Sequence, residues 1–295
     1  MQSAEFLSAV FFYLKEGETL NQNWIVENLN NAFSTWNGKL GELWGLVTTG
    51  PQTFKGGAVW SGMQTLHNGM VGIGYALVVL FFAISLCKNT MNFHELKRPE
   101  AAIHYFLRFV AAKTLVGYGM DIMLNVFSIC NGIVTDMADS MGGISEAMVS
   151  LPAEMQTAIE NVGFLASIPL WLVTILGSLF ITVLSFVMIL TVYGRFFRLY
   201  MYTALAPLPL AAFAGESTQS VGISFLKSYV GVCLEGAVIV LACVIYSAFV
   251  GTPTVTGGEA TTIVWSYLAE TVFNMLVLVG LIKGSDRIIH EMMGL

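Results

Sequence analysis

The sequence predicts an all-α protein, a polytopic membrane bundle of helices, and three observations lead to this fold class. Of the 295 residues, 56% are apolar and only 11% are charged, whereas soluble domains average about 45–50% and about 25%. Apolar windows long enough to cross a bilayer, each with no charged residue or a single one, recur along the chain. Lys and Arg gather in the connections on one side of these windows. This composition argues against a soluble enzyme, and the net charge of −6 argues against a surface that attracts nucleic acid throughout.

The first 68 residues are expected to form a separate extracytoplasmic region that does not cross the membrane. Apolar side chains between residues 19 and 47 recur with a period close to 3.6, which predicts an amphipathic helix. They are Ile25, Leu29, Phe33, Trp36, Leu40, Leu43 and Val47. The tryptophans of this region suit a membrane–water interface or a partner surface, with packing inside the protein as the alternative. The candidate interfacial anchors are Trp24, Trp36, Trp44 and Trp60.

Residues 69–295 are expected to form the transmembrane domain, with about five crossings. A helix rises about 1.5 Å per residue, so about 20 apolar residues cross roughly 30 Å of hydrocarbon. The predicted spans are residues 69–87, 114–134, 164–192, 229–250 and 262–282.

Segment 199–215 is expected to be a broken, re-entrant stretch rather than a span. Pro207 and Pro209 remove backbone donors and interrupt helix continuity. If the segment re-enters, ten Lys and Arg residues fall on one side and none falls in the connections 135–161 and 251–261. This asymmetry predicts an outer N-terminus and a cytoplasmic C-terminus. Because carbonyls freed by a break must be satisfied inside protein or in a wet cavity, the two prolines mark a candidate gate.

Three carboxylates fall inside the predicted spans: Asp121, Glu235 and Glu270. A carboxylate at the centre of a lone membrane helix costs about 2.5–3.5 kcal/mol, so these groups should face protein or water. Each is a candidate for interhelical hydrogen bonding, for lining an aqueous path, or for a proton relay.

The basic side chains at the predicted inner face are candidates for contacts with lipid headgroups or with cytoplasmic partners. They are Lys88, Lys97, Arg98, Arg108, Lys113, Arg195 and Arg198.

No motif indicates catalysis, and the protein is not expected to be an enzyme. The nucleophile-elbow, zinc-protease, P-loop and dinucleotide motifs are all missing from the sequence. The four cysteines form no C-x-x-C pair and the four histidines show no ligand spacing, so no metal site is predicted. No cofactor is expected, although a bound phospholipid between the spans stays open.

Four consecutive features between residues 193 and 240 form a pattern. They are an aromatic and basic turn at Tyr193–Arg198, a proline break at Ala204–Leu210, a polar link at Gly215–Gly222, and the start of a carboxylate-bearing span at Phe225–Glu235. This pattern resembles the polytopic inner-membrane subunit of type IV secretion and conjugation machines, the TrbL/VirB6 family. The topology expected for residues 69–295 is also similar to that family.

The resemblance implies an integral subunit of a conjugative transfer machine in the bacterial plasma (inner) membrane. Such a subunit forms or lines the passage for a DNA–protein or protein substrate and scaffolds the inner-membrane complex. The implied partners are further copies in a homo-oligomeric ring, other type IV secretion subunits, cytoplasmic ATPases and, transiently, a single-stranded DNA–relaxase complex or a secreted protein. Two alternatives stay open: a small-solute or ion-coupled transporter using Glu235 and Glu270, and a structural membrane anchor.

Overall fold

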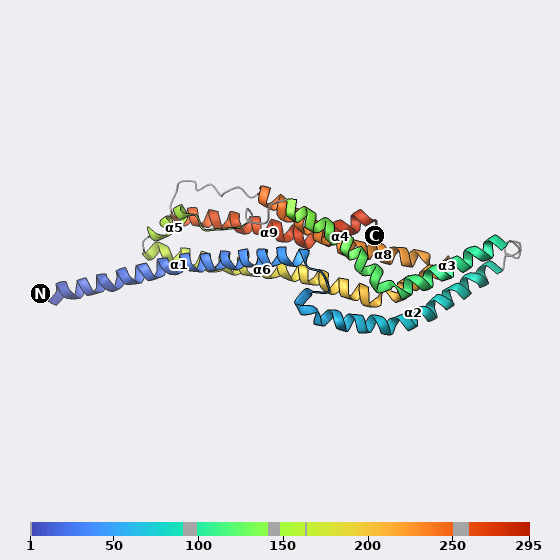
Figure 1. Cartoon of the computed structure of the whole chain (residues 1–295). Helices are drawn as coiled ribbons and strands as arrows, with labels where there is room; N and C mark the ends of the chain where they lie inside the picture. The colour runs from blue at the N-terminus through green and yellow to red at the C-terminus, as the bar shows by residue number, and fades with distance from the viewer. Residues whose placement is uncertain (1, 91–98, 141–147, 163, 250–259) are drawn as a thin grey trace. The chain divides into compact units, whose positions relative to one another are not determined.

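The computed structural model describes residues 2–90, 99–140, 148–162, 164–249 and 260–295. Every regular element within these ranges is helical (Figure 1), which confirms the predicted fold class. The helices are α1 (Gln2–Thr48), α2 (Ala58–Thr90), α3 (Pro99–Gly117), α4 (Gly119–Ser140), α5 (Ala153–Glu160), α6 (Phe164–Leu205), α7 (Pro207–Ala211), α8 (Gln219–Phe249) and α9 (Ala260–Met293), with 3-10 turns η1 (Phe54–Gly57) and η3 (Ala212–Ala214).

Four of the helical stretches that the structure describes are long and apolar enough to cross a membrane. They are Phe54–Lys88, Ile168–Leu205, Gln219–Ala248 and Thr262–Met293, and they cover four of the five predicted spans. The fifth predicted span, 114–134, is divided between two helices instead, because α3 ends at Gly117 and α4 begins at Gly119. Glycine is the weakest helix former after proline, so a pair of glycines around Tyr118 favours a break there.

The described chain divides into two compact units. Unit 1 comprises Met1–Trp44, Met141–Thr191 and Ala242–Lys283, and unit 2 comprises Gly45–Ser140, Val192–Leu241 and Gly284–Leu295. The expected boundary at residue 68, between an extracytoplasmic region and a transmembrane domain, stays a prediction. Most of α1 belongs to the same unit as parts of α6 and α9.

In unit 1 the predicted apolar stripe of α1 is buried, which explains why this helix joins the unit. Phe33 packs edge-on against Tyr267 of α9, with ring centroids 6.4 Å apart. The side-chain amide of Asn28 donates a hydrogen bond to the hydroxyl of Ser178 in α6 at 3.1 Å. Burying each large apolar side chain contributes roughly 1.5–3 kcal/mol. The stripe residues in this unit, all at most 2% exposed, are Ile25, Leu29, Phe33, Trp36, Leu40 and Leu43.

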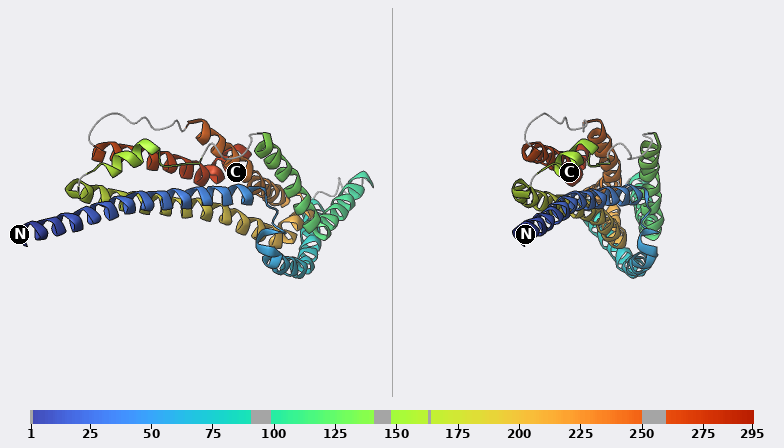
Figure 2. Two further views of the ribbon diagram at one scale, coloured as in Figure 1. Left: turned by 60° about the vertical axis from the view of Figure 1, so that its left-hand side comes forward. Right: turned by 90° about the vertical axis from the view of Figure 1, so that its left-hand side faces the viewer.

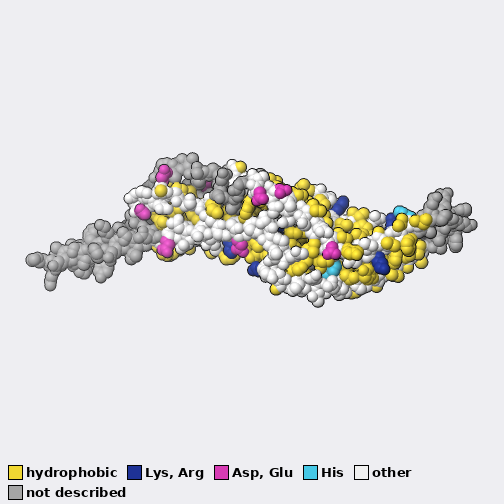
Figure 3. Space-filling model, viewed as in Figure 1, with side chains coloured by type: hydrophobic (Ala, Val, Ile, Leu, Met, Phe, Trp, Pro, Cys, Tyr) yellow, Lys and Arg dark blue, Asp and Glu magenta, His cyan; other side chains and the backbone are white. Residues whose placement is uncertain are grey.

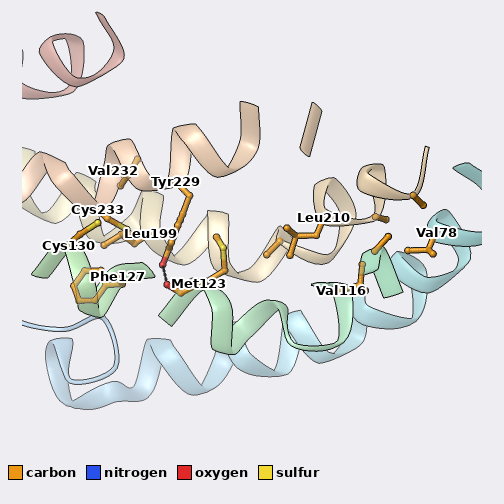
Figure 4. Close-up of a cluster of buried hydrophobic side chains, with 14 residues drawn as sticks. Val78, Val116, Met123, Phe127, Cys130, Leu199, Leu210, Tyr229, Val232 and Cys233 are labelled. Carbon is orange, nitrogen blue, oxygen red and sulfur yellow. Dashed lines mark hydrogen bonds between the residues drawn. The ribbon is translucent and has the colours of Figure 1, made fainter. Parts of the chain in front are cut away.

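Unit 2 is built around the proline-broken segment. Helix α7 and turn η3 pack against both α2 and α3, and α2 and α3 run side by side (Figure 1 and the left-hand view of Figure 2). Figure 4 shows the core of the unit, where Phe127 and Cys130 of α4 meet Leu199 of α6 and Cys233 of α8. Tyr229 of α8 donates a hydrogen bond across this core to the carbonyl of Met123 at 2.8 Å.

The outer surface of the α2–α3 pair is strongly apolar. Hydrophobic side chains dominate this part of the surface in Figure 3. Val79, Leu80, Ile103 and Phe106 are 51–62% exposed. A contiguous apolar surface of this kind is typical of contact with lipid or protein rather than with water.

Candidate functional site

The last three turns of α6 carry the polar groups of the candidate site. Arg195, Arg198 and Thr203 precede the end of the helix, and Pro207 begins α7. These residues and the groups that they contact lie within unit 2. The site therefore joins three neighbouring interactions along one helix.

Arg195 is fully buried and binds backbone carbonyls. Its Nε donates to Val232 at 3.2 Å and its Nη2 to Cys233 at 3.0 Å, both in α8. Its Nη1 donates to Val47 at 3.4 Å, in the last turn of α1, where helical carbonyls lack partners. The planar fork of a guanidinium suits several acceptors at once. All three contacts of this arginine are made inside the protein, whereas the sequence suggested a lipid or partner contact.

A glycine on α8 makes room for this guanidinium. A Cβ atom at Gly236 would lie 2.7 Å from Nη1 of Arg195 and 2.8 Å from its Cζ atom. Carbon atoms do not approach so closely, so a larger residue would displace the guanidinium from its carbonyl partners. The arginine and the glycine therefore depend on each other.

Arg198, which is half-buried, forms an ion pair with the buried carboxylate of Glu235. The Nη2 atom of Arg198 lies 2.7 Å and 2.8 Å from the two carboxylate oxygens of Glu235, which is 1% exposed. The Ser285 hydroxyl donates to the same carboxylate at 3.2 Å, and Nη1 of Arg198 donates to Asp286. Charge-assisted hydrogen bonds of this kind are about twice as strong as neutral ones. Of the roles considered for Glu235, the observed contacts are those of an interhelical hydrogen-bonding group joining α6, α8 and α9.

The proline break has a dedicated hydrogen-bond donor. Pro207 has no N–H, so the carbonyl of Thr203, four residues earlier, loses its helical partner. The Nδ1 atom of His67 in α2 lies 2.7 Å from that carbonyl oxygen, and the histidine is only 2% exposed. Because a carbonyl only accepts, Nδ1 carries the hydrogen. His67 was not predicted as a site residue, and it precedes the predicted span 69–87, so the apolar windows gave no signal for it.

Glycines let the neighbouring helices close around the break. A Cβ at Gly74 would lie 3.0 Å from Cβ of Pro207 and 2.9 Å from Val116, and a Cβ at Gly119 would lie 3.1 Å from Leu210. Each glycine therefore permits an approach that a side chain would block.

The position of the break differs in detail from the predicted segment 199–215. Helix α6 continues to Leu205, and the interruption falls between this residue and Pro207. The aromatic and basic turn expected at Tyr193–Arg198 is part of the helix. Pro207 is buried, and Pro209 is half-buried. The irregular stretch is shorter than the predicted segment, because proline is tolerated in the first turn of a helix and α7 can therefore begin at Pro207.

The other two predicted carboxylates do not join this site. Asp121 is exposed on α4, and Glu270 is exposed on α9 within unit 1. Within the ranges that the structure describes, no group of three or more His, Cys, Asp or Glu side chains is arranged to hold a metal ion.

The remaining basic candidates lie apart from the ion pair. Arg108 is half-buried, donates to Gln219 at 3.4 Å and lies 3.9 Å from the carboxylate of Glu216. Lys88 and Lys113 are exposed. Lys97 and Arg98 lie outside the described residues.

The four tryptophans occupy different environments. Trp24 is 41% exposed, and its ring centroid lies 5.7 Å from that of Trp171 in α6. Trp36 is fully buried, which favours the packing alternative for this residue. Trp44 and Trp60 are half-buried, and the Trp60 ring lies 6.3 Å from that of Tyr200.

The helical bundle, its four apolar helices and its buried polar contacts define a polytopic membrane protein. Residues 36–207, more than half of the chain, match the family described as TrbL/VirB6 plasmid conjugal transfer like protein, and the chain belongs to this family. The match begins before residue 69 and so includes part of α1, and it ends at residue 207, so it covers only the first part of the 193–240 pattern. No curated protein and no solved structure matches the chain.

Family membership gives the general character of the protein. The family is a structural component of conjugation and is not a known enzyme family. Together with the four apolar helices, it indicates an inner-membrane protein of conjugal transfer that associates with other type IV secretion subunits.

Proposed function

We propose that this chain is an integral subunit of a conjugative transfer machine that forms or lines the membrane passage for a DNA–protein or protein substrate and scaffolds the inner-membrane complex. The observation that carries the proposal is the family match over residues 36–207. Four helices long and apolar enough to cross a bilayer support a position within the membrane.

The proposed assembly is a homo-oligomeric ring with an outer N-terminus and a cytoplasmic C-terminus on each chain. Other type IV secretion subunits and cytoplasmic ATPases are its neighbours, and the single-stranded DNA–relaxase complex or a secreted protein contacts it transiently. The ATPases supply the energy, in keeping with the missing P-loop motif of this sequence. The chain itself needs no cofactor, and a phospholipid between the spans fits the proposal.

The proline-broken segment is proposed as the inner constriction of the passage. His67 satisfies the carbonyl that Pro207 leaves free, and Gly74 allows α2 to close against that proline. A constriction keeps a fixed shape only if the broken segment is held by close contacts of this kind. Without them, the carbonyl groups at the break would have no hydrogen-bond partner inside the membrane.

The contacts of Glu235 argue against the secondary-transporter alternative. A coupling ion or proton needs a carboxylate that is free to bind and release it. Arg198 and Ser285 both bond to the Glu235 carboxylate. Binding or releasing an ion or a proton at the Glu235 carboxylate would break three hydrogen bonds to this buried group. The Arg198–Glu235 pair therefore suits a structural role better.

Deletion of the gene in a conjugating host tests the proposal. We expect an in-frame deletion to abolish transfer of the mobile element to recipient cells, and the full-length gene supplied in trans to restore it. A coupling-ATPase deletion provides the positive control for loss of transfer. Undiminished transfer by the deletion strain would contradict the proposed function.

A further inference from the structure

A polar cavity in unit 2 lies outside the arginine and proline contacts. It has a volume of about 560 Å³ and lies between α4 and the connection that follows α1. Asp121, Asn125 and Ser128 of α4 line it. Their spacing of four and then three residues places the three side chains on one helix face. Met123 and Cys130, on the other side of the same helix, are buried in the core of the unit.

The opposite wall of the cavity is held in place by hydrogen bonds. This wall comprises residues 50–52 of the connection after α1. The hydroxyl of Tyr200 donates to the carbonyl of Pro51 at 2.8 Å. The side-chain amide of Asn131, which also lines the cavity, donates to the carbonyl of Thr48 at 3.2 Å. These two hydrogen bonds hold the connection after α1 in place beside α4. The cavity between them is therefore formed by the packing of unit 2.

The lining groups require water or a polar ligand. The side chains of Asp121, Asn125 and Ser128 are all exposed, whereas the Oδ1 atom of Asn131 is enclosed and has no hydrogen-bond partner among the described residues. A carboxylate, amides and a hydroxyl on one helix face are costly against hydrocarbon, because lipid offers them no hydrogen bonds. Liquid water occupies about 30 Å³ per molecule, so the cavity has room for several water molecules.

The charge of the lining has one sign. Among the lining residues that the structure describes, Asp121 carries the single charge, and it is negative. A cleft lined by one sign of charge concentrates ions of the opposite sign. DNA phosphates are repelled by the same charge.

We propose that this cavity is a water-filled site that admits small cations and excludes anions, with Asp121 setting the preference. The proposal does not depend on the conjugative role of the chain. Asn125 and Ser128 supply oxygen atoms that suit a hydrated cation.

Charged thiol reagents applied to the full-length chain in its native membranes test this site. The starting variant is Cys87→Ser, because Cys87 is exposed while Cys130, Cys233 and Cys243 are buried. Ser128→Cys is then added, and its reaction rates are measured with a cationic trimethylammonium-ethyl and an anionic sulfonato-ethyl methanethiosulfonate. Each rate is divided by the rate of the same reagent with a free thiol in solution.

The corrected rate for the cationic reagent should exceed that for the anionic reagent by about tenfold, the lower end of the effect of a charged cleft. Adding Asp121→Asn should remove most of this preference. Ile129→Cys is the matched control, because Ile129 is 69% exposed on the same helix but does not line the cavity. Its reaction should show no comparable preference.

Two results would overturn the proposal. One is a Ser128→Cys thiol that reacts with neither reagent in membranes but reacts after denaturation, since the cavity would then hold no water. The other is a preference that Asp121→Asn leaves unchanged. If the Ser128→Cys chain does not accumulate, Asn125→Cys on the same face takes its place. The rates need no partner subunits, so failure of the conjugative role leaves this test intact.

Discussion

The Nδ1 atom of His67 lies 2.7 Å from the carbonyl oxygen of Thr203, the group that Pro207 leaves without a helical partner. The two residues are 136 positions apart in the sequence, and both are buried. Leaving a buried acceptor unpaired costs about 1–3 kcal/mol. The contact therefore compensates for the proline inside a membrane protein, where water is not at hand.

We expect His67→Phe to destabilise the chain by about 1–3 kcal/mol, because Thr203 then loses its donor. The penalty should shrink when Pro207→Ala is also present, since the substituted alanine has an N–H that can reach the carbonyl of Thr203. Thermal unfolding of the detergent-solubilised chain measures the effect of His67→Phe on stability in the wild-type and in the Pro207→Ala background. His104→Phe, at an exposed position of α3, is the control. An equal penalty in the two backgrounds would show that the histidine does not serve the proline break.

Removing Arg198 should be more damaging than removing Glu235. Arg198→Met leaves a 1% exposed carboxylate without its cation, a loss of about 3–5 kcal/mol. Glu235→Gln leaves Arg198 still bonded to Asp286, so its cost should be smaller. Replacing both residues with methionine should recover part of the stability lost in Arg198→Met, as expected of a coupled pair. Glu270→Gln, at an exposed site, should change little. Additive losses in the double variant would contradict the coupling.

The fit between Arg195 and Gly236 predicts a conditional effect. Gly236→Ala should cost about 1–3 kcal/mol, because the added methyl group pushes the guanidinium away from its three carbonyl partners. In an Arg195→Met background the same change should cost much less, since no guanidinium is displaced. Arg195→Lys should also destabilise, because an ammonium cannot reproduce the planar fork. Unfolding in detergent gives these differences, and a Gly236→Ala penalty that is independent of residue 195 would refute the fit.

Two glycines in the same helix provide a matched pair. Gly74→Ala should destabilise the chain by about 1–3 kcal/mol, because its methyl group would meet Val116 and Pro207 at 3.0 Å or less. Gly72→Ala has nothing within 4 Å, so it should be neutral or slightly stabilising through higher helix propensity. Equal behaviour of the two variants on thermal unfolding would mean that α2 does not close against the break.

Straightening the broken segment should impair transfer. In the double variant Pro207→Ala, Pro209→Ala, restored N–H groups allow α6 to continue through the break, which changes the proposed constriction. We expect a drop in conjugation frequency with wild-type protein levels in the membrane. Normal transfer by a stably inserted double variant would remove the constriction role.

Local sequence pattern predicted the parts of the fold that depend on local chemistry. The 3.6-residue period identified the side chains of α1 that are buried, among them Leu29 and Leu40. The break before Pro207 followed from the missing donor. The glycines that flank Tyr118 were a similar signal, but the apolar content of 114–134 outweighed them, and that segment was predicted as one span.

Long-range contacts could not be read from the sequence. Arg195 and Arg198 are one turn apart and both suited the inner face of a membrane, but only the folded chain shows which groups surround them. Arg195 is buried because Gly236 leaves space for it and Val47 ends a helix beside it. These partners are 41 and 148 residues away in the sequence, so no local pattern connects them.

A crosslinking experiment during active conjugation tests directly whether the chain lines the passage for the transferred DNA. Cells of the native host are treated with formaldehyde, the chain is immunoprecipitated, and transferred-strand DNA is quantified. We predict enrichment of this DNA that requires the relaxase and the coupling ATPase, which would place the chain on the substrate route. No enrichment, with a neighbouring machine subunit positive in the same cells, would contradict a role in the passage.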